Sequence, residues 1–133
     1  MDHFEIISWN DQPLAYVIRA GMSPEKTTFL TPNDFNFQVG FVVYPTGGEV
    51  KRHIHKKVER HITGTTELIM LKSGNCEIDI YNDEQEFVTT RSLRTGDIVL
   101  TVSGGHGFRM TEDTILLEVK QGPYSGVDEK HRF

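Results

Sequence analysis

Short runs of β-branched and aromatic residues follow one another along the whole chain, separated by Gly, Pro, Asn and Asp. The residues of the runs favour strands, whereas the residues between them favour turns. No long amphipathic helix interrupts the series. Only "SPEKT" (23–27), with Ser23 as a cap and Pro24 in the first position, indicates one helical turn. The sequence therefore predicts an all-β protein.

Eight strands are predicted from these runs. They cover 14–19, 35–44, 49–55, 67–72, 76–81, 86–92, 97–102 and 114–120. In "CEIDIY" (76–81), Cys76 and Ile78 alternate with acidic residues, which is typical of a strand with one buried face, and "NDEQ" (82–85) has the length of a hairpin connection to the next strand. A sheet with so many strands exposes edges that invite aggregation unless it closes or doubles over. A small barrel or a jelly-roll sandwich is favoured.

Composition limits the class of protein. The 133 residues contain no linker-like stretch, which predicts a single domain over 1–133. A net charge of −5 argues against nucleic-acid binding, because a phosphate-tracking surface is normally basic. Cys76 is the one cysteine and cannot form an intrachain disulfide. The start resembles no secretion signal and no apolar run would span a membrane, so we expect a cytoplasmic protein without membrane contacts.

The chemically most informative stretch is "HIH" at 53–55. In a strand, His53 and His55 project from the same face about 7 Å apart and can converge on one metal ion. The alternative interpretation is that both are solvated residues of a wet strand. Two further candidate ligands elsewhere in the sequence favour the interpretation as a metal site.

Two further side chains complete a possible ligand set. Glu67 begins a predicted strand and shares a face with Ile69 and Leu71, so its carboxylate lies in line with core residues, where it requires a cation or several hydrogen-bond donors. The alternative is a solvated carboxylate at the strand end. His106 lies in "SGGHG", where glycines predict a sharp bend that displays one large polar side chain. Together the four residues supply three nitrogens and one carboxylate.

This pattern resembles the cupin superfamily. Gly47, His53, His55, Glu67 and Gly74 match its first motif, with eleven residues between His55 and Glu67 where three or four are usual. We assign the ligand to Glu67 because Glu59, which fits the usual gap, is not followed by glycine at the required distance, and we interpret 56–66 as a lengthened loop.

The second cupin motif is matched less closely. Gly96, Gly104 and His106 resemble it, with Val102 in place of the usual proline, one residue fewer before the histidine, and Met110 where asparagine is common. The ending of the chain, "EVKQGPYSGVDEKHRF", is similar to the tails of small cupins associated with sugar and polysaccharide metabolism. The resemblance implies a double-stranded β-helix, that is, a cupin jelly-roll barrel.

A ligand set of three histidines and one carboxylate suits a divalent ion such as Fe, Mn, Ni, Zn or Co, with open positions for water or substrate. The sequence does not select the metal. Lys51 and Arg60 belong to a basic group around the histidines, which would attract a small anionic or sugar-derived ligand, although these charges could instead balance Glu49 and Glu59. Phe108 shares a strand face with His106 if the strand resumes there, and is a candidate for ligand contact as well as for packing.

Three functions are compatible with these features. The first is a metal-dependent enzyme, either an isomerase or epimerase acting on a sugar derivative, or a dioxygenase. The second is a binding module that holds a small anion without chemistry, and the third is a mainly structural oligomer. Edge strands at the N-terminus and the tail lead us to expect a homodimer. General acid and base residues are not assigned, since fold alone does not supply a reaction.

Overall fold

The computed structural model describes residues 3–126 and 129–133. The chain divides into two compact units, one formed by residues 1–22 and 65–133 and the other by Ser23–Gly64. Each unit is described by itself. The assignment of 1–133 to a single domain stays a prediction.

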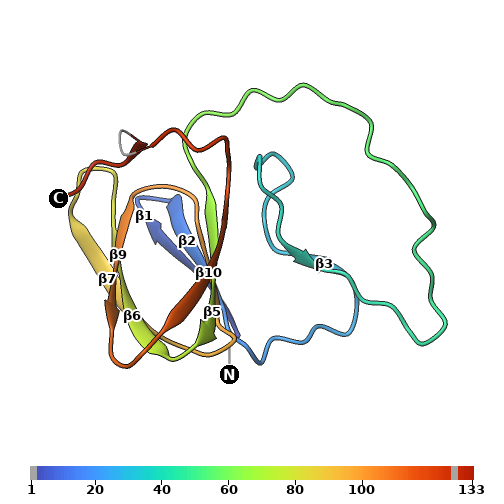
Figure 1. Ribbon diagram of the computed structural model, residues 1–133, viewed down its shortest axis with the longest axis horizontal. Helices are drawn as coiled ribbons and strands as arrows, with labels where there is room; N and C mark the ends of the chain where they lie inside the picture. The colour runs from blue at the N-terminus through green and yellow to red at the C-terminus, as the bar shows by residue number, and fades with distance from the viewer. Residues whose placement is uncertain (1–2, 127–128) are drawn as a thin grey trace. The chain divides into compact units, whose positions relative to one another are not determined.

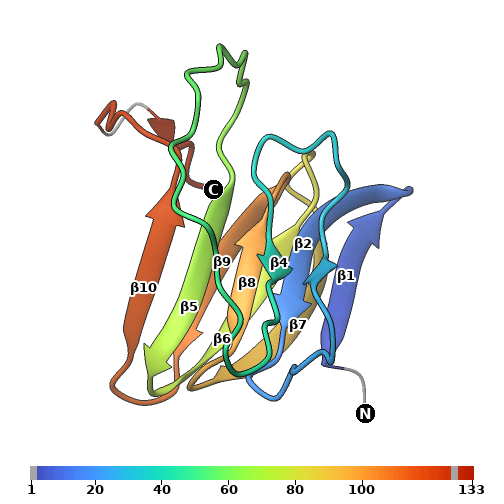
Figure 2. The ribbon, with the colours of Figure 1, turned by 90° about the vertical axis from the view of Figure 1, so that its right-hand side faces the viewer.

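The larger unit contains eight antiparallel strands. These are β1 (Phe4–Trp9), β2 (Gln12–Ile18), β5 (Glu67–Ser73), β6 (Asn75–Tyr81), β7 (Phe87–Arg94), β8 (Ile98–Thr101), β9 (Gly105–Met110) and β10 (Ile115–Lys120). They form a five-stranded sheet in the order β1-β2-β8-β5-β10 and a three-stranded sheet in the order β7-β6-β9. Figure 2 shows the five-stranded sheet face on, with the three-stranded sheet behind it. The prediction of an all-β protein is confirmed, and among the described residues hydrogen bonding between strands does not close the sheets into a barrel.

The two sheets face each other across one apolar core (Figure 1). The five-stranded sheet contributes Val17, Leu71 and Val99, which are at most 1% exposed. The alternate residues of β6, Cys76, Ile78 and Ile80, fill the core from the other side. The predicted alternation in "CEIDIY" is therefore confirmed. Burial of such side chains is the main favourable term that holds the two layers together.

Tight turns set the register of the hairpins. Asn10 and Asp11 both have positive φ, 48° and 62°, and join β1 to β2 in a two-residue turn of the kind that matches strand twist. The predicted connection 82–85 joins β6 to β7, and the Asn82 side-chain oxygen accepts hydrogen bonds from the backbone amides of Glu84 and Glu86. The strand β1 was missing from the sequence prediction.

The smaller unit contains the short antiparallel pair β3 (Thr28–Phe29) and β4 (Gly40–Phe41). The segment between them is held by Gln38, whose amide group donates to the carbonyl oxygens of Pro32 and Phe35 and whose oxygen accepts from the hydroxyl of buried Thr31. After β4, residues 42–64 contain no strand.

Six predicted strands overlap β2, β5, β6, β7, β8 and β10. The prediction of a strand over 35–44 holds only at Gly40–Phe41, and that over 49–55 is wrong, as is the helical turn at 23–27. A strand needs a hydrogen-bonded neighbour as well as β-prone residues, and no described strand pairs with 49–55, where Val50 and Ile54 are exposed. The count is ten strands in the described residues rather than eight.

Candidate functional site

Glu67 and His106 come from opposite sheets and meet at one end of the sandwich. Glu67 opens β5 on the face that carries Ile69 and Leu71, which are 2% and 1% exposed, so the predicted inward placement of this carboxylate is confirmed. His106 lies in β9 opposite Ile80, at the end of the inner row of the three-stranded sheet. The predicted bend in "SGGHG" is confirmed at Gly104, which has φ +71°, but it does not extend to His106, because the strand begins directly after Gly104.

The distance between the two groups suits a shared ion. His106 Nε2 lies 3.6 Å from Glu67 Oε1, which is longer than a hydrogen bond. Two ligand atoms bound at about 2.1 Å to one ion are separated by roughly 3.0–3.5 Å at octahedral or tetrahedral angles. The side chains are 24% and 12% exposed, so they keep an opening toward solvent. The pair therefore fits two adjacent positions of a metal ion after a shift of a few tenths of an ångström.

The Glu67 carboxyl group lacks a strong cationic partner. Its pKa is raised to about 7, chiefly by burial and next by a hydrogen bond with Glu118, while Lys120 and Lys130 oppose the change. The pKa of Glu118 is lowered, chiefly by the same hydrogen bond. A proton thus resides on Glu67 and is donated to ionised Glu118. A divalent cation would replace that proton and favour the ionised form.

The His106 ring is held in the neutral form that metal binding requires. Burial lowers its pKa, against the opposing effect of the Glu118 charge. Phe108, two residues along β9, packs edge-on against the ring, with ring centroids 5.8 Å apart. The predicted common face of His106 and Phe108 is confirmed, and Phe108 also packs against the core. A role of Phe108 in ligand binding stays a prediction.

His53 and His55 lie in the smaller unit. Their ring centroids are 5.1 Å apart, so the two rings are neighbours although the segment is not a strand. His53 Nδ1 lies 2.8 Å from the carbonyl oxygen of Lys51. A carbonyl oxygen can only accept, so Nδ1 carries the hydrogen, and Nε2 is the nitrogen that would bind a metal, which is the usual arrangement of a histidine ligand. The assignment of both residues as ligands stays a prediction.

The predicted ligand-binding residues Lys51 and Arg60 are exposed members of the smaller unit. The Lys51 side chain has no described partner, and its backbone carbonyl orients His53. Arg60 likewise has no described hydrogen bond or ion pair. Both cations are therefore available to an anion, and their role remains a prediction.

Glu118 and Lys120 were not identified from the sequence. In "TILLEVK", Leu116, Glu118 and Lys120 occupy one face of β10, and Lys120 stands directly opposite Glu67 in the sheet. This face of β10 lies beside the inward face of β5 because the two strands pair. The sequence of β10 alone does not reveal that pairing. Glu118 and Lys120 thus add one carboxylate and one ammonium group to the surroundings of Glu67.

Within the described residues, no group of three or more His, Cys, Asp or Glu side chains has an arrangement ready to hold a metal. The described residues also include no helix long and apolar enough to cross a membrane. No protein-family model matches the chain, and no curated protein or solved structure matches it.

Proposed function

We propose that this chain is a small cupin-type protein, a double-stranded β-helix that binds one divalent metal ion and, with it, a small anionic or sugar-derived ligand. The proposed metal ligands are His53, His55, Glu67 and His106. The observation that carries the proposal is the approach of Glu67 and His106 from opposite sheets to 3.6 Å. The inward position of this pair, mostly buried but open to solvent on one side, is where an ion could be held and still be reached by a ligand.

The chemistry of the four residues supports the same assignment. Imidazole and carboxylate ligands suit Fe, Mn, Ni, Zn and Co, and a bound ion of this kind would act as a Lewis acid toward ligand oxygens. The Glu67 carboxyl group holds a proton in the absence of a cation and shares a hydrogen bond with Glu118, and a divalent cation would displace that proton. Lys51 and Arg60 would attract an anionic ligand.

The proposal has two forms, which differ in whether the protein converts the bound ligand into a product. In the first, the protein is an isomerase, an epimerase or a dioxygenase that uses the ion. In the second, it binds the ligand and performs no chemistry. Incubating metal-loaded protein with sugar phosphates and organic acids separates them, because a pure binder raises its melting temperature with the ligand and leaves the ligand unchanged.

Metal content tests the proposal directly. We expect protein purified without chelator to carry close to one ion per chain, and His53→Ala and His106→Ala to lose most of it. His61→Ala is the matched control, since His61 is an exposed histidine of the smaller unit that is not among the proposed ligands. Wild-type protein that stays free of metal after dialysis against each of the five ions would overturn the proposal, as would equal loss in the control.

We also propose that the protein is cytoplasmic and forms a homodimer. Support for the dimer comes from β10, an edge strand of the five-stranded sheet, whose outward residues Ile115, Leu117 and Val119 are about half exposed. An apolar row along an open strand edge favours association with a second copy.

A further inference from the structure

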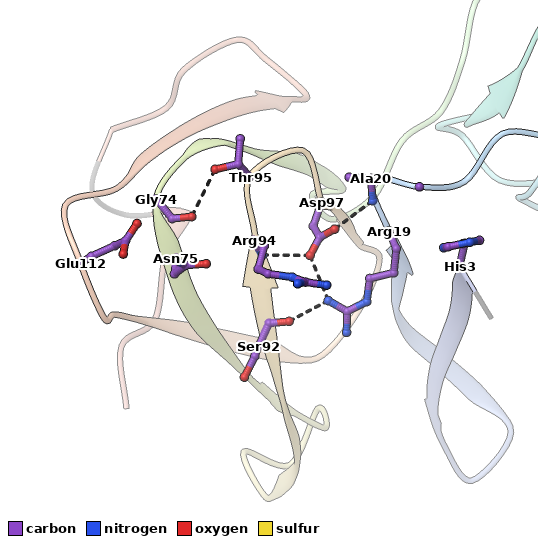
Figure 3. A pocket seen from close by; sticks show the side chains of 11 residues that line it. His3, Arg19, Ala20, Gly74, Asn75, Ser92, Arg94, Thr95, Asp97 and Glu112 are labelled. Atoms are coloured by element: carbon purple, nitrogen blue, oxygen red, sulfur yellow. Dashed lines mark hydrogen bonds and ion pairs between the residues drawn. The ribbon is translucent and has the colours of Figure 1, made fainter. Parts of the chain in front are cut away.

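A pocket lined by several charged residues lies at the opposite end of β5 from Glu67. It has a volume of about 900 Å³ and opens between the turns that follow β2, β5, β7 and β9 (Figure 3). Glu67 begins β5 and Gly74 of the pocket directly follows its end, so the two sites are separated by about 20 Å of extended strand. The pocket is thus distinct from the proposed metal site.

One wall of the pocket is built rigidly around Asp97. This side chain is 5% exposed and accepts hydrogen bonds from the backbone amides of Ala20 and Arg94, both at 2.9 Å, and from Arg19 Nη1 at 3.0 Å. Arg19 Nη1 also donates to the carbonyl oxygen of Ser92 at 2.7 Å. The carboxylate therefore holds the Arg19 guanidinium and the backbone of Arg94 in place.

The guanidinium groups of Arg19 and Arg94 point toward one another across the pocket (Figure 3). Within the described part of the chain, the Arg94 side chain has no hydrogen bond or ion pair, and Arg19 uses only Nη1. Two positive charges thus face each other, with Asp97 in an ion pair with Arg19 and Glu5 as a further carboxylate near Arg19. His3 lines the same end and can add a further donor.

The opposite end of the pocket has a different character. Glu112 and Asn75 lie there, away from the arginines (Figure 3). Glu112 has no described side-chain partner. A carboxylate and an amide accept hydrogen bonds from hydroxyl groups, and the carboxylate also repels a second anion. The pocket is therefore polarised, with one basic end and one end that suits neutral hydroxyl groups.

We propose that this pocket binds the phosphate group of a small hydroxylated molecule. The forked guanidinium donors of Arg19 and Arg94 match phosphate oxygens, and the charge of a phosphate monoester relieves the repulsion between them. The volume exceeds that of an inorganic ion and leaves space for a body of sugar size, whose hydroxyl groups meet Glu112 and Asn75. The proposal uses none of the proposed metal ligands and does not depend on metal binding.

Calorimetric titration of the chelator-treated protein at constant ionic strength tests this site. The probes are glucose 6-phosphate, inorganic phosphate and glucose. We expect saturable binding of glucose 6-phosphate, weaker binding of inorganic phosphate and none of glucose. Equal affinity for the two phosphates would overturn the role given to the Glu112 end, and absence of saturable binding of either would overturn the site.

Two variants distinguish binding in this pocket from nonspecific attraction of the anion to the positive charges of the protein. Arg94→Gln should weaken the binding of glucose 6-phosphate about tenfold or more, because a charged hydrogen-bonded partner is lost. Its melting temperature should not change, because the Arg94 side chain bonds to nothing described in the fold. Arg132→Gln, the same change at an exposed arginine outside the pocket, should bind as the wild type does. Equal affinity in Arg94→Gln, or equal weakening in both variants, would contradict the proposal.

Discussion

Glu67 and Glu118 share a hydrogen bond across the β5–β10 pair although both are acids. One of them must carry a proton to donate, and burial places it on Glu67, whose pKa rises to about 7. This relationship links three properties of the molecule: the inward face of β5, the proposed metal site, and the dependence of stability on pH.

The first prediction concerns stability between pH 4.5 and 7. The folded state holds the Glu67 proton up to about pH 7, whereas the unfolded chain releases it near the ordinary value of 4.5. The folded state therefore binds more protons in this window, and the free energy of unfolding of metal-free protein should fall as pH rises through it, by about 2 kcal/mol. Denaturant titrations at pH 5 and pH 8 measure the difference.

Glu67→Gln should remove most of this pH dependence, because glutamine keeps the shape and cannot ionise. Glu59→Gln, at an exposed position of the smaller unit, serves as the control and should leave the slope unchanged. If the free energy of unfolding of Glu67→Gln still falls by the wild-type amount between pH 5 and pH 8, the assignment of the proton to Glu67 is refuted.

The second prediction concerns Asp97. Its carboxylate holds Ala20, Arg94 and Arg19 together at one end of the sandwich. Asp97→Ala leaves two backbone amides without their acceptor, so we expect a loss of about 2–4 kcal/mol in the free energy of unfolding. Chemical denaturation measures this loss. Asp34→Ala, which changes an exposed aspartate without described side-chain partners, should cost less than about 0.5 kcal/mol, and a similar cost in both would contradict the role of Asp97.

Much of the larger unit could be predicted from the sequence, because its strands alternate between buried and exposed residues. Cys76, Ile78 and Ile80 give that signal in β6, and all three are in the core. Glu67 was placed correctly for the same reason, since Ile69 and Leu71 mark the buried face of β5.

The prediction from sequence is wrong where the strand propensity of a segment disagrees with the strand pairing in the fold. The run 49–55 is predicted as a strand, but no described strand pairs with it. Conversely, the glycines around His106 indicate a turn, yet β9 pairs with β6 along its whole length. Glu118 and Lys120 escaped notice because their approach to Glu67 depends on the partner strand. Local sequence does not encode which strands become neighbours.

The third prediction compares Gly104 and Gly107, two glycines close to His106 in the sequence. Gly104 has φ +71°, and a Cβ there would lie 2.2 Å from the carbonyl oxygen of Tyr81. Gly104→Ala should therefore destabilise the protein by about 2 kcal/mol or more, through both backbone strain and overlap. Gly107 has open space around the added atom, so Gly107→Ala should cost little. Thermal melts of the two variants measure this difference. Equal melting temperatures of Gly104→Ala and Gly107→Ala would show that the backbone at Gly104 does not require a glycine.

The fourth prediction tests the proposed dimer through the outer row of β10. Leu117 and Val119 are each 49% exposed on an edge strand, and a charge there would be buried against a second copy. Leu117→Glu should therefore shift the protein from dimer to monomer in sedimentation velocity, with its strand content unchanged by circular dichroism. Phe87→Glu is the matched control, since Phe87 is an exposed apolar residue on β7, an edge of the other sheet. If Leu117→Glu remains dimeric, or if Phe87→Glu alone dissociates, then β10 does not form the interface.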